Sequence, residues 1–193
     1  MASAAVDKIN GLTLIPDWLS ERDATTLITE IDSNPWRDDL RRRVQHYGYI
    51  YDYRARQVTH DMRIGALPDW LMPLAKTITR DLNLPTIFDQ VIINEYQPGQ
   101  GISAHIDCRP CFGETVASLS LGSAVDMYFS KPQDQVRHTL RLEPQSLLIL
   151  QGDARHVWKH AIPPRKSDVV NGVRIGRTRR LSLTFRTVRA QSS

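Results

Sequence analysis

Two histidines and one aspartate constrain this chain more than any other feature of its sequence. His105-Ile106-Asp107 supplies two of these side chains, and His160 follows in a separate segment. Two imidazoles and one carboxylate on one face of a metal, with the other positions open, are the ligand set of non-heme Fe(II) oxygenases. A closed structural zinc site would leave no open position. Because an H-x-D sequence also arises often by chance, the neighbouring segments have to support the metal site.

A strand and a turn precede the H-x-D sequence. The segment Phe88 to Tyr96 is rich in β-branched and aromatic residues, and it ends at Gln97-Pro98-Gly99-Gln100-Gly101. Asn94 and Tyr96 are two residues apart, so a strand directs both side chains to the same face. We therefore expect the first metal ligands just beyond a rigid strand, whose hydrogen bonds can hold them in place.

Short strands separated by turn residues continue downstream. Their spacing is typical of an antiparallel meander and not of βαβ units. The Gly152 to Arg155 segment is expected to turn the chain toward His160. The sequence thus predicts a mostly β protein with flanking helices. The expected strands are 115–122, 126–130, 137–142 and 146–151.

The last expected strand, Arg180 to Arg186, alternates polar and apolar residues. Arg180, Ser182, Thr184 and Arg186 share one face of such a strand. Two arginines on an inward face require anions, because buried charge must be paired. A dicarboxylate would satisfy both, since each guanidinium binds a carboxylate through two parallel hydrogen bonds. An edge strand with one solvated face is the alternative interpretation.

Six short blocks occur in order along the chain. They are Asn94-x-Tyr96-x-Pro98-Gly99, His105-x-Asp107, Ser118 to Gly122, Gly152-x-x-Arg155, His160-x-Ile162 and Arg180-x-Ser182-Leu183-Thr184-Phe185-Arg186. Together they resemble the AlkB family of Fe(II)- and 2-oxoglutarate-dependent dioxygenases, over Gly11 to Arg189. Arg42 to Tyr49 and the H-x-D sequence most resemble the animal branch that hydroxylates a modified wobble uridine in tRNA.

The resemblance implies a double-stranded β-helix, or jelly roll, that uses Fe(II), 2-oxoglutarate and O2. At position 182 the chain departs from the best-known bacterial member, which has asparagine and one more hydrogen bond to the co-substrate there. The implied catalytic and metal-binding residues are His105, Asp107 and His160. The implied 2-oxoglutarate-binding residues are Asn94, Tyr96, Arg180, Ser182 and Arg186.

Similar enzymes oxidatively dealkylate bases in DNA or RNA and release succinate, CO2 and an aldehyde. The same site would also suit a hydroxylase of a modified tRNA uridine, or a demethylase of protein side chains. A nucleic-acid-binding pseudo-enzyme is the non-enzymatic alternative. The complete ligand set and both arginines argue against it, because a pseudo-enzyme has no physical need for them.

The candidate substrate residues are less specific. Tyr47 and Tyr49 begin an alternating run of tyrosines that resembles the family's nucleotide-recognition lid, in which a ring stacks on an extruded base. An aromatic cross-strand ladder is the alternative. Arg109 stands where the family's repair enzymes usually carry an acid that accepts a hydrogen bond from a base's amine. Arg155 either approaches the substrate or braces the ligand loop.

Length and charge agree with one domain that binds nucleic acid. The 193 residues suit a single domain, with helices and a substrate lid over 1–87 and the jelly-roll core over 88–189. Lys and Arg number 25 against 21 Asp and Glu. The excess gathers at Arg41-Arg42-Arg43, Arg165-Lys166 and Arg174 to Arg180, where it would contact phosphates or form ordinary solvated surface.

Two helices are expected before residue 88. Ser20 and Asp23 form a capping box that opens a helix to Ile31. A second helix is expected over Asp69 to Leu82, with Pro73 kinking it or delaying its start. Residues 167–176 are expected as a mobile loop.

Cys108 and Cys111 form a single C-x-x-C. Without a second pair for zinc or a βαβ context for redox chemistry, free thiols are expected. The sequence has no signal peptide and no apolar run approaching the ~20 residues of a membrane span. We therefore expect a cytoplasmic monomer with no membrane partner.

Overall fold

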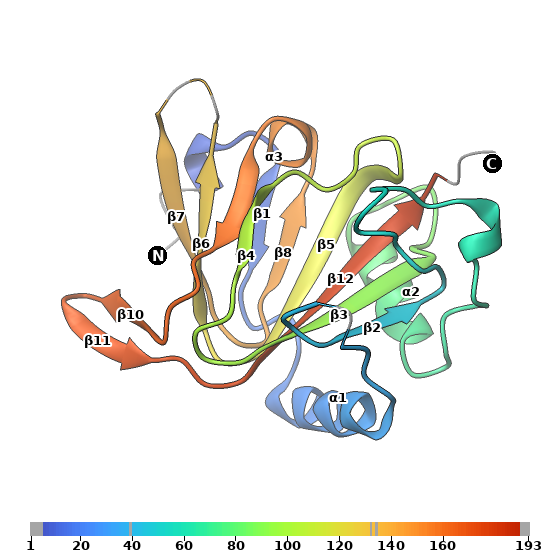
Figure 1. Ribbon diagram of the computed structural model, residues 1–193, viewed down its shortest axis with the longest axis horizontal. Coiled ribbons are helices and arrows are strands. Elements are labelled where there is room, and N and C mark those ends of the chain that lie inside the picture. Colours follow the sequence, from blue (N-terminus) through green and yellow to red (C-terminus); the bar gives the residue numbers. More distant parts are fainter. Residues whose placement is uncertain (1–5, 39, 132, 134, 190–193) are drawn as a thin grey trace.

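The computed structural model describes residues 6–38, 40–131, 133 and 135–189, and within them two β-sheets pack face to face beside two longer helices (Figure 1). This arrangement is the jelly-roll core expected from the sequence. The larger sheet has the order β1 (Leu12–Ile15), β8 (Leu147–Leu150), β5 (Phe112–Gly122), β12 (Arg180–Val188), β3 (Gln90–Tyr96), β2 (Val44–Tyr47). The smaller sheet has the order β4 (Ile102–His105), β9 (Lys159–Ile162), β6 (Val125–Ser130), β7 (Arg137–Leu142).

Two apolar cores hold these layers together. One lies between the larger sheet and the helices α1 (Glu21–Ser33) and α2 (Met72–Asp81). The other lies between the two sheets, where Val116 and Leu150 of the larger sheet share a cluster with Phe129 of the smaller one. The second interior also contains the cavity described below, so the packing of the sheets fixes the walls of the site.

Strand β12 lies in the middle of the larger sheet, and the side chains on its two faces have different surroundings. It pairs with β3 on one side and with β5 on the other. Leu181, Leu183 and Phe185 enter the core under the helices. Arg180 and Arg186 face the other way and are buried. The alternation expected from the sequence is confirmed, and the edge-strand interpretation is wrong because β12 has a partner on each side.

The helix signals locate one helix start correctly and the other approximately. The Ser20 hydroxyl accepts a hydrogen bond from the backbone N–H of Asp23 at 3.1 Å, so the expected cap is present. Helix α2 starts at Met72, three residues after Asp69, with Pro73 in its first turn. Proline is accepted there because that turn needs no N–H partner. Within the described residues, no helix is long and apolar enough to cross a membrane.

The tyrosine-rich segment leaves the sheet earlier than the alternation predicts. Strand β2 ends at Tyr47, and Gly48 follows with a φ of +79°. A Cβ at Gly48 would lie 1.8 Å from the carbonyl oxygen of Asp89, so only glycine fits. The chain then turns, and Tyr53 lies in a turn and not in a strand. The prediction of strand-like alternation is therefore wrong beyond Tyr47.

Residues 167–176, expected as a mobile loop, form a β-hairpin. Strands β10 (Ser167–Val170) and β11 (Val173–Gly176) pair along their whole length and project from the body at the left of Figure 1. Asp168 secures the base of the hairpin, because its carboxylate accepts hydrogen bonds from Arg177 at 2.6 and 2.7 Å. The prediction of a mobile loop is wrong, because strand pairing and this ion pair hold the segment in place.

Candidate functional site

The two histidines and the aspartate meet at one end of the smaller sheet. His105 ends β4 and lies directly opposite His160 of β9, and Asp107 follows His105 after one residue. Asp107 Oδ1 is 3.4 Å from His105 Nε2 and 3.7 Å from His160 Nε2. The candidate ligand atoms all lie within 4.8 Å of one another. This cluster can hold a metal on one side and leave the opposite side open.

The protonation states suit metal ligands. The Nδ1 of His105 is 2.8 Å from the carbonyl oxygen of Ser103, which can only accept, so Nδ1 carries the proton and the Nε2 lone pair is free. Burial lowers the pKa of His160 to about 3, so its imidazole is neutral near pH 7. Burial alone would raise the pKa of Asp107, but Arg186 and the neighbouring histidines hold it well below its usual range. Asp107 is therefore a carboxylate.

Asp107 is shared between the candidate metal position and the last strand. Its second oxygen, Oδ2, accepts a hydrogen bond from Arg186 Nε at 2.8 Å. The Arg186 guanidinium also lies over the ring of Phe112, with its carbon 4.8 Å from the ring centre. Arg186 thus orients the carboxylate so that Oδ1 faces the histidines.

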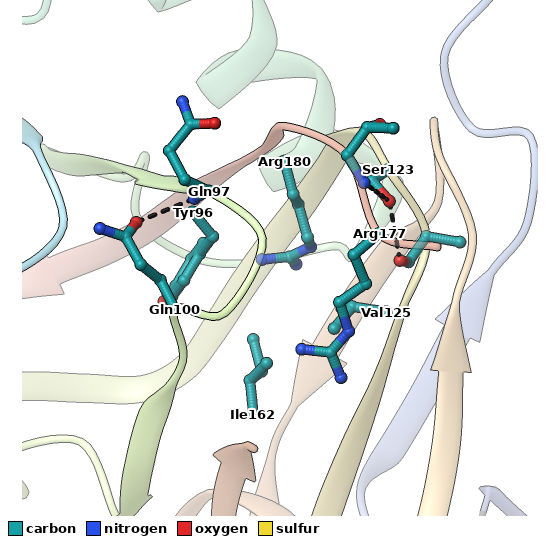
Figure 2. A pocket seen from close by; sticks show the side chains of 10 residues that line it. Tyr96, Gln97, Gln100, Ser123, Val125, Ile162, Arg177 and Arg180 are labelled. Carbon is teal, nitrogen blue, oxygen red and sulfur yellow. Dashed lines mark hydrogen bonds between the residues drawn. The ribbon is translucent and has the colours of Figure 1, made fainter. Parts of the chain in front are cut away.

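Arg180 is a buried cation that lacks an anion among the described residues. Its side chain is 2% exposed, and Nη2 donates to the hydroxyl of Ser120 at 2.9 Å. Nε and Nη1 have no hydrogen-bond partner in the described part of the chain. Burial lowers the pKa of Arg180 to about 10, so it remains charged near pH 7. Figure 2 shows it reaching into the space between Tyr96 and Ile162.

A cavity of about 630 Å³ is lined by His105, Asp107, His160 and Arg186, and it shares Tyr96 and Ile162 with the small pocket that Arg180 lines. The pairing of β12 with β3 sets Arg180 opposite Tyr96 and Ser182 opposite Asn94. The Ser182 hydroxyl lies 2.9 Å from that of Ser118. A linear dicarboxylate fits this donor set, because one carboxylate would satisfy Arg180 while the other reaches the metal. The residues present therefore suit both Fe(II) and 2-oxoglutarate.

Arg155 lies behind the ligand loop and not in the cavity. It is 1% exposed and belongs to the short helix α3 (Gly152–His156), where the sequence predicted only a turn. Its guanidinium donates to the carbonyl oxygens of Asp107 at 2.9 Å, Cys108 at 3.2 Å and Gly113 at 3.2 Å. Of the two roles considered for Arg155, this geometry matches the brace.

The other candidate substrate residues lie away from the cavity. Tyr47 donates from its hydroxyl to Gln45, and its ring packs edge-on against Trp70. Tyr49 packs beside a small apolar cluster under the lid. Arg109 is exposed and donates to the carbonyl oxygen of His156. In the described part of the chain, the side chains of Tyr47, Tyr49 and Arg109 do not line the cavity.

The tyrosine run does contribute to the cavity, but through its later members, which were not among the substrate candidates. Tyr51 and Tyr53 line it, with their ring centres 5.0 Å apart and edge to face. Arg42 lies within 6.0 Å of the ring centres of Tyr53 and Tyr96, and its Nε donates to Asn94 Oδ1 at 2.8 Å. The alternation of tyrosines was a usable signal, but the turn at Gly48 shifted which members face inward.

Cys108 and Cys111 form a disulfide, so the expectation of free thiols is wrong. Both sulfur atoms lie 3.3 Å from the carbonyl oxygen of Arg56. They pack with Val58 and Phe112 in an apolar cluster beside the ligand loop. The segment that contains Arg56 and Val58 is thereby in contact with the loop that carries Asp107.

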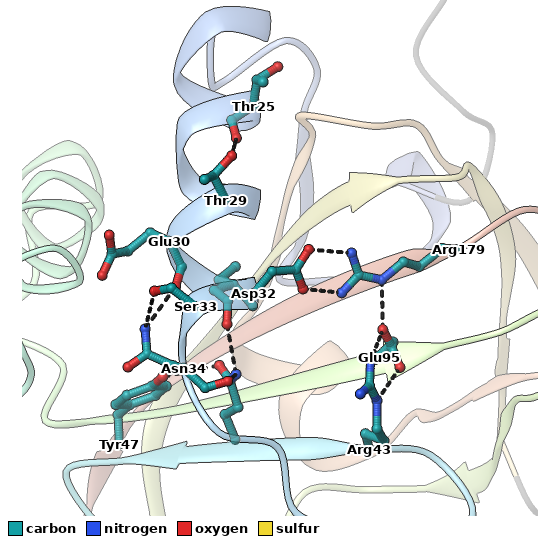
Figure 3. A network of polar contacts seen from close by, with 12 residues as sticks. Thr25, Thr29, Glu30, Asp32, Ser33, Asn34, Arg43, Tyr47, Glu95 and Arg179 are labelled. Atoms are coloured by element: carbon teal, nitrogen blue, oxygen red, sulfur yellow. Dashed lines mark hydrogen bonds and ion pairs between the residues drawn. The ribbon is translucent and has the colours of Figure 1, made fainter.

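An ion-pair network supports the strands from the face opposite the cavity (Figure 3). Glu95 is 2% exposed and accepts hydrogen bonds from Arg43 Nε at 2.7 Å and from Arg179 Nε at 2.6 Å. Arg179 also binds Asp32 of α1. Glu95 lies between Asn94 and Tyr96 in sequence, and Arg179 precedes Arg180. The network therefore ties together the two strands that carry the polar end of the cavity.

Comparisons with known proteins agree with this geometry. A profile of the 2OG-Fe(II) oxygenase superfamily matches residues 11–186. The alkylated DNA repair protein ALKBH8 homolog of Arabidopsis thaliana is 35% identical over 94% of this chain and 59% of its own length. The Xenopus tropicalis tRNA (carboxymethyluridine(34)-5-O)-methyltransferase alkbh8 is 35% identical over 93% of this chain and 32% of its own length. The chain thus spans less than two thirds of either relative.

A solved structure shares the fold. The structure of OsALKBH1 superposes with a TM-score of 0.69, covers 92% of this chain and 96% of its own, and is 21% identical in sequence. At that identity the match establishes the arrangement of the strands and nothing about substrate.

The brace formed by Arg155 predicts a loss of metal affinity when it is weakened. Arg155→Lys removes the forked hydrogen bonds to the ligand loop, and Mn(II) affinity should fall by about 10–100-fold, as for other supports of metal ligands. Electron paramagnetic resonance titration of Mn(II) measures this directly. Arg109→Lys changes an exposed arginine on the same loop and should leave the affinity unchanged. An equal loss in both variants would contradict the brace.

The Glu95 network predicts a pH-dependent contribution to stability. The hydrogen bond from Arg43 is the largest cause of the lowered pKa of Glu95, so its contribution is complete above the unfolded-state pKa and is lost as pH falls through the folded-state pKa. Glu95→Gln should cost ~2 kcal/mol near pH 7, and the difference from the parent protein should shrink in acid. Urea unfolding at several pH values tests this.

Asp32→Asn is the matched control for Glu95→Gln, because Asp32 shares Arg179 and its side chain is 42% exposed. It should cost less than about 1 kcal/mol, as exposed ion pairs do. A difference for Glu95→Gln that stays constant from pH 7 into acid would show that the carboxylate charge does not stabilise the fold.

Proposed function

The chain belongs to the 2OG-Fe(II) oxygenase superfamily and, within it, to the AlkB family, and on that premise we propose that it oxidises a carbon substituent on a base of DNA or RNA. Its cofactors are those of an Fe(II)- and 2-oxoglutarate-dependent dioxygenase. Oxidative dealkylation with release of an aldehyde is the first candidate reaction. The observation that carries the proposal is the His-Asp-His cluster that lines the cavity, with the buried cation Arg180 in an adjacent pocket that shares Tyr96 and Ile162 with it.

In this proposal, three side chains of the chain hold the metal. His105 and His160 would offer their Nε2 atoms, and Asp107 would offer Oδ1. Arg186 keeps the other oxygen of Asp107, Oδ2, engaged, so Asp107 would offer a metal its Oδ1 atom. When bound, Fe(II), 2-oxoglutarate and O2 would supply C–H hydroxylation: 2-oxoglutarate would be converted to succinate and CO2, with one oxygen atom of O2 entering succinate and the other entering the hydroxylated substrate.

Arg180 and Tyr96 would hold the distal carboxylate of the co-substrate. The two residues lie opposite one another in the sheet, and the Arg180 guanidinium carbon is 5.4 Å from the Tyr96 ring centre. Asn94 and Ser182 form the neighbouring pair and would contact the rest of the molecule. This placement leaves the Tyr51 and Tyr53 side of the cavity for an extruded base, which stacking on an aromatic ring would stabilise.

Hydroxylation of a modified tRNA uridine is the second candidate, and the charge of the cavity favours it. Among the described residues lining the cavity, Asp107 is the sole carboxylate, and it is engaged by Arg186. Arg41, Arg42 and Arg56 line the same space. Uracil presents carbonyl acceptors to such donors, whereas the amines of adenine and cytosine need an acceptor. The name of the Xenopus relative also refers to a modified tRNA uridine.

The cofactor assignment predicts a spectroscopic signature. Fe(II) and 2-oxoglutarate mixed with the protein without oxygen should give the weak visible charge-transfer band of an iron chelate. His160→Ala removes one metal ligand and should abolish the band. Arg180→Met should retain Mn(II) binding but raise the 2-oxoglutarate concentration needed for the band by about tenfold or more, because a charge-assisted bidentate contact is lost. Formation of the band in His160→Ala would refute the ligand assignment.

The substrate proposal predicts a mass change on nucleic acid. We expect methylated DNA and RNA oligonucleotides to lose a methyl mass if the chain dealkylates bases, and a tRNA uridine to gain one oxygen if the second candidate is correct. Mass spectrometry of both substrates, with His160→Ala as the control, separates the reactions. Succinate formation without a mass change on any nucleic acid would contradict the base substrate while leaving the cofactor chemistry intact.

A further inference from the structure

The outward face of the smaller sheet carries a cluster of cations that the catalytic site does not use. Strand β6 buries Val125, Met127 and Phe129 and turns Tyr128 and Ser130 outward. On β9, Ala161 pairs with Tyr128 and Lys159 pairs with Ser130, while His160 pairs with the buried Phe129. The outward face is therefore the reverse side of the sheet that carries His105 and His160, two of the candidate metal ligands.

Two arginines flank Tyr128 on this face. The guanidinium carbon of Arg137 lies 4.2 Å from the centre of the Tyr128 ring. Arg165 Nη1 donates to the Tyr128 hydroxyl at 2.9 Å. In the strand register, Ser130 lies opposite Arg137 on β7 and opposite Lys159 on β9. We refer to Tyr128, Ser130, Arg137, Lys159 and Arg165 as the Tyr128 patch.

Two carboxylates of the described residues near this patch, Asp126 and Asp168, are already paired with arginines. Asp126, on the same face of β6, accepts from Arg141 at 3.1 Å. Asp168 at the base of the hairpin binds Arg141 at 3.2 Å and Arg177 at 2.6 Å. Within the described residues, no ion pair joins Arg137, Lys159 or Arg165 to a carboxylate. The patch thus presents net positive charge.

The geometry of the patch suits phosphate oxygens. Stacking on Tyr128 holds the Arg137 guanidinium flat, so less side-chain freedom is lost when its N–H fork binds an anion. The Ser130 hydroxyl adds a neutral donor between two cations, and hydroxyl and guanidinium donors together are typical of contacts to nucleic-acid backbones. Tyr128, Ser130, Arg137 and Lys159 stand on regular strands, which hold side chains in position better than loops do. Arg165 lies between β9 and β10, and its hydrogen bond to Tyr128 positions it.

The position of the patch connects it to the cavity. In the smaller sheet, β4 is the edge strand and β9 is its neighbour. Ile102 and Ser103 of β4 line the cavity, and Ser103 is exposed. A polymer that leaves the cavity across β4 therefore reaches the outward face of β9 and β6 next. A polynucleotide with one base in the cavity can contact the patch with its neighbouring phosphates. A short acidic peptide has no group for the cavity and therefore gains no affinity from the closeness of the two sites.

We infer that the Tyr128 patch binds backbone phosphates of the nucleic-acid substrate, at a distance from the base in the cavity. This inference rests on the proposed function. The patch increases the affinity for long nucleic acids and takes no part in the oxidation of the base. A substrate that fills only the cavity does not reach it.

The test compares two triple variants of the full chain. Arg137→Gln/Lys159→Gln/Arg165→Gln removes the charges of the patch, and Lys8→Gln/Arg22→Gln/Lys76→Gln removes three exposed charges elsewhere. Fluorescence anisotropy measures binding to labelled bulk tRNA and to a labelled trinucleotide at several salt concentrations. Thermal unfolding verifies that both variants fold.

The patch variant should bind tRNA about tenfold more weakly at low salt, and the slope of log K against log salt should decrease in magnitude by about 2–3, one contact for each cation. Its trinucleotide affinity should match that of the parent. An effect on tRNA equal to that of the control variant, or an equal loss for the trinucleotide, would overturn the inference.

Two further measurements distinguish a failure of the patch inference from a failure of the proposed function. Uncoupled succinate formation without nucleic acid should be the same in all proteins, and its absence from the parent would refute the proposed function and not the patch. Binding of poly-L-glutamate provides the second measurement. Unchanged tRNA affinity together with lost poly-L-glutamate binding would assign the patch to an acidic protein segment and overturn the inference.

Discussion

The carboxylate of Asp107 is the contact on which the rest of the site depends. One oxygen faces His105 and His160, and the other accepts a hydrogen bond from Arg186 at 2.8 Å. Its backbone carbonyl is held by Arg155 from behind. A loop residue is thereby fixed by side chains on β12 and α3, which are regular elements with buried neighbours. That support gives the ligand set a defined shape before a metal binds.

Strand β12 explains why the cavity is cationic. As a central strand it must bury both faces, and its apolar residues occupy the face under the helices. The opposite face carries Arg180 and Arg186, which would be unfavourable in an interior without anions. Arg186 forms an ion pair with Asp107, whereas among the described residues Arg180 has the Ser120 hydroxyl as its one side-chain hydrogen-bond partner. The fold therefore holds a partly unsatisfied cation that a dicarboxylate would stabilise.

The sequence predicted what depends on local spacing. Period-two alternation located β12 and its inward arginines, and the Ser20 cap located α1. Features set by contacts distant in sequence could not be read in this way. The short strands β1 and β2 exist because β8 and β3 offer them partners. The hairpin at 167–176 depends on Arg177 reaching Asp168, and the tyrosines at the cavity depend on a turn fitted to Asp89.

The most direct test of this account is a crystal structure of the protein grown without oxygen in the presence of Mn(II) and 2-oxoglutarate. We expect density for the metal at bonding distance from His105 Nε2, Asp107 Oδ1 and His160 Nε2. One carboxylate of 2-oxoglutarate should lie on the metal and the other on Arg180. A metal bound elsewhere, or a dicarboxylate that leaves Arg180 without an anion, would contradict the account.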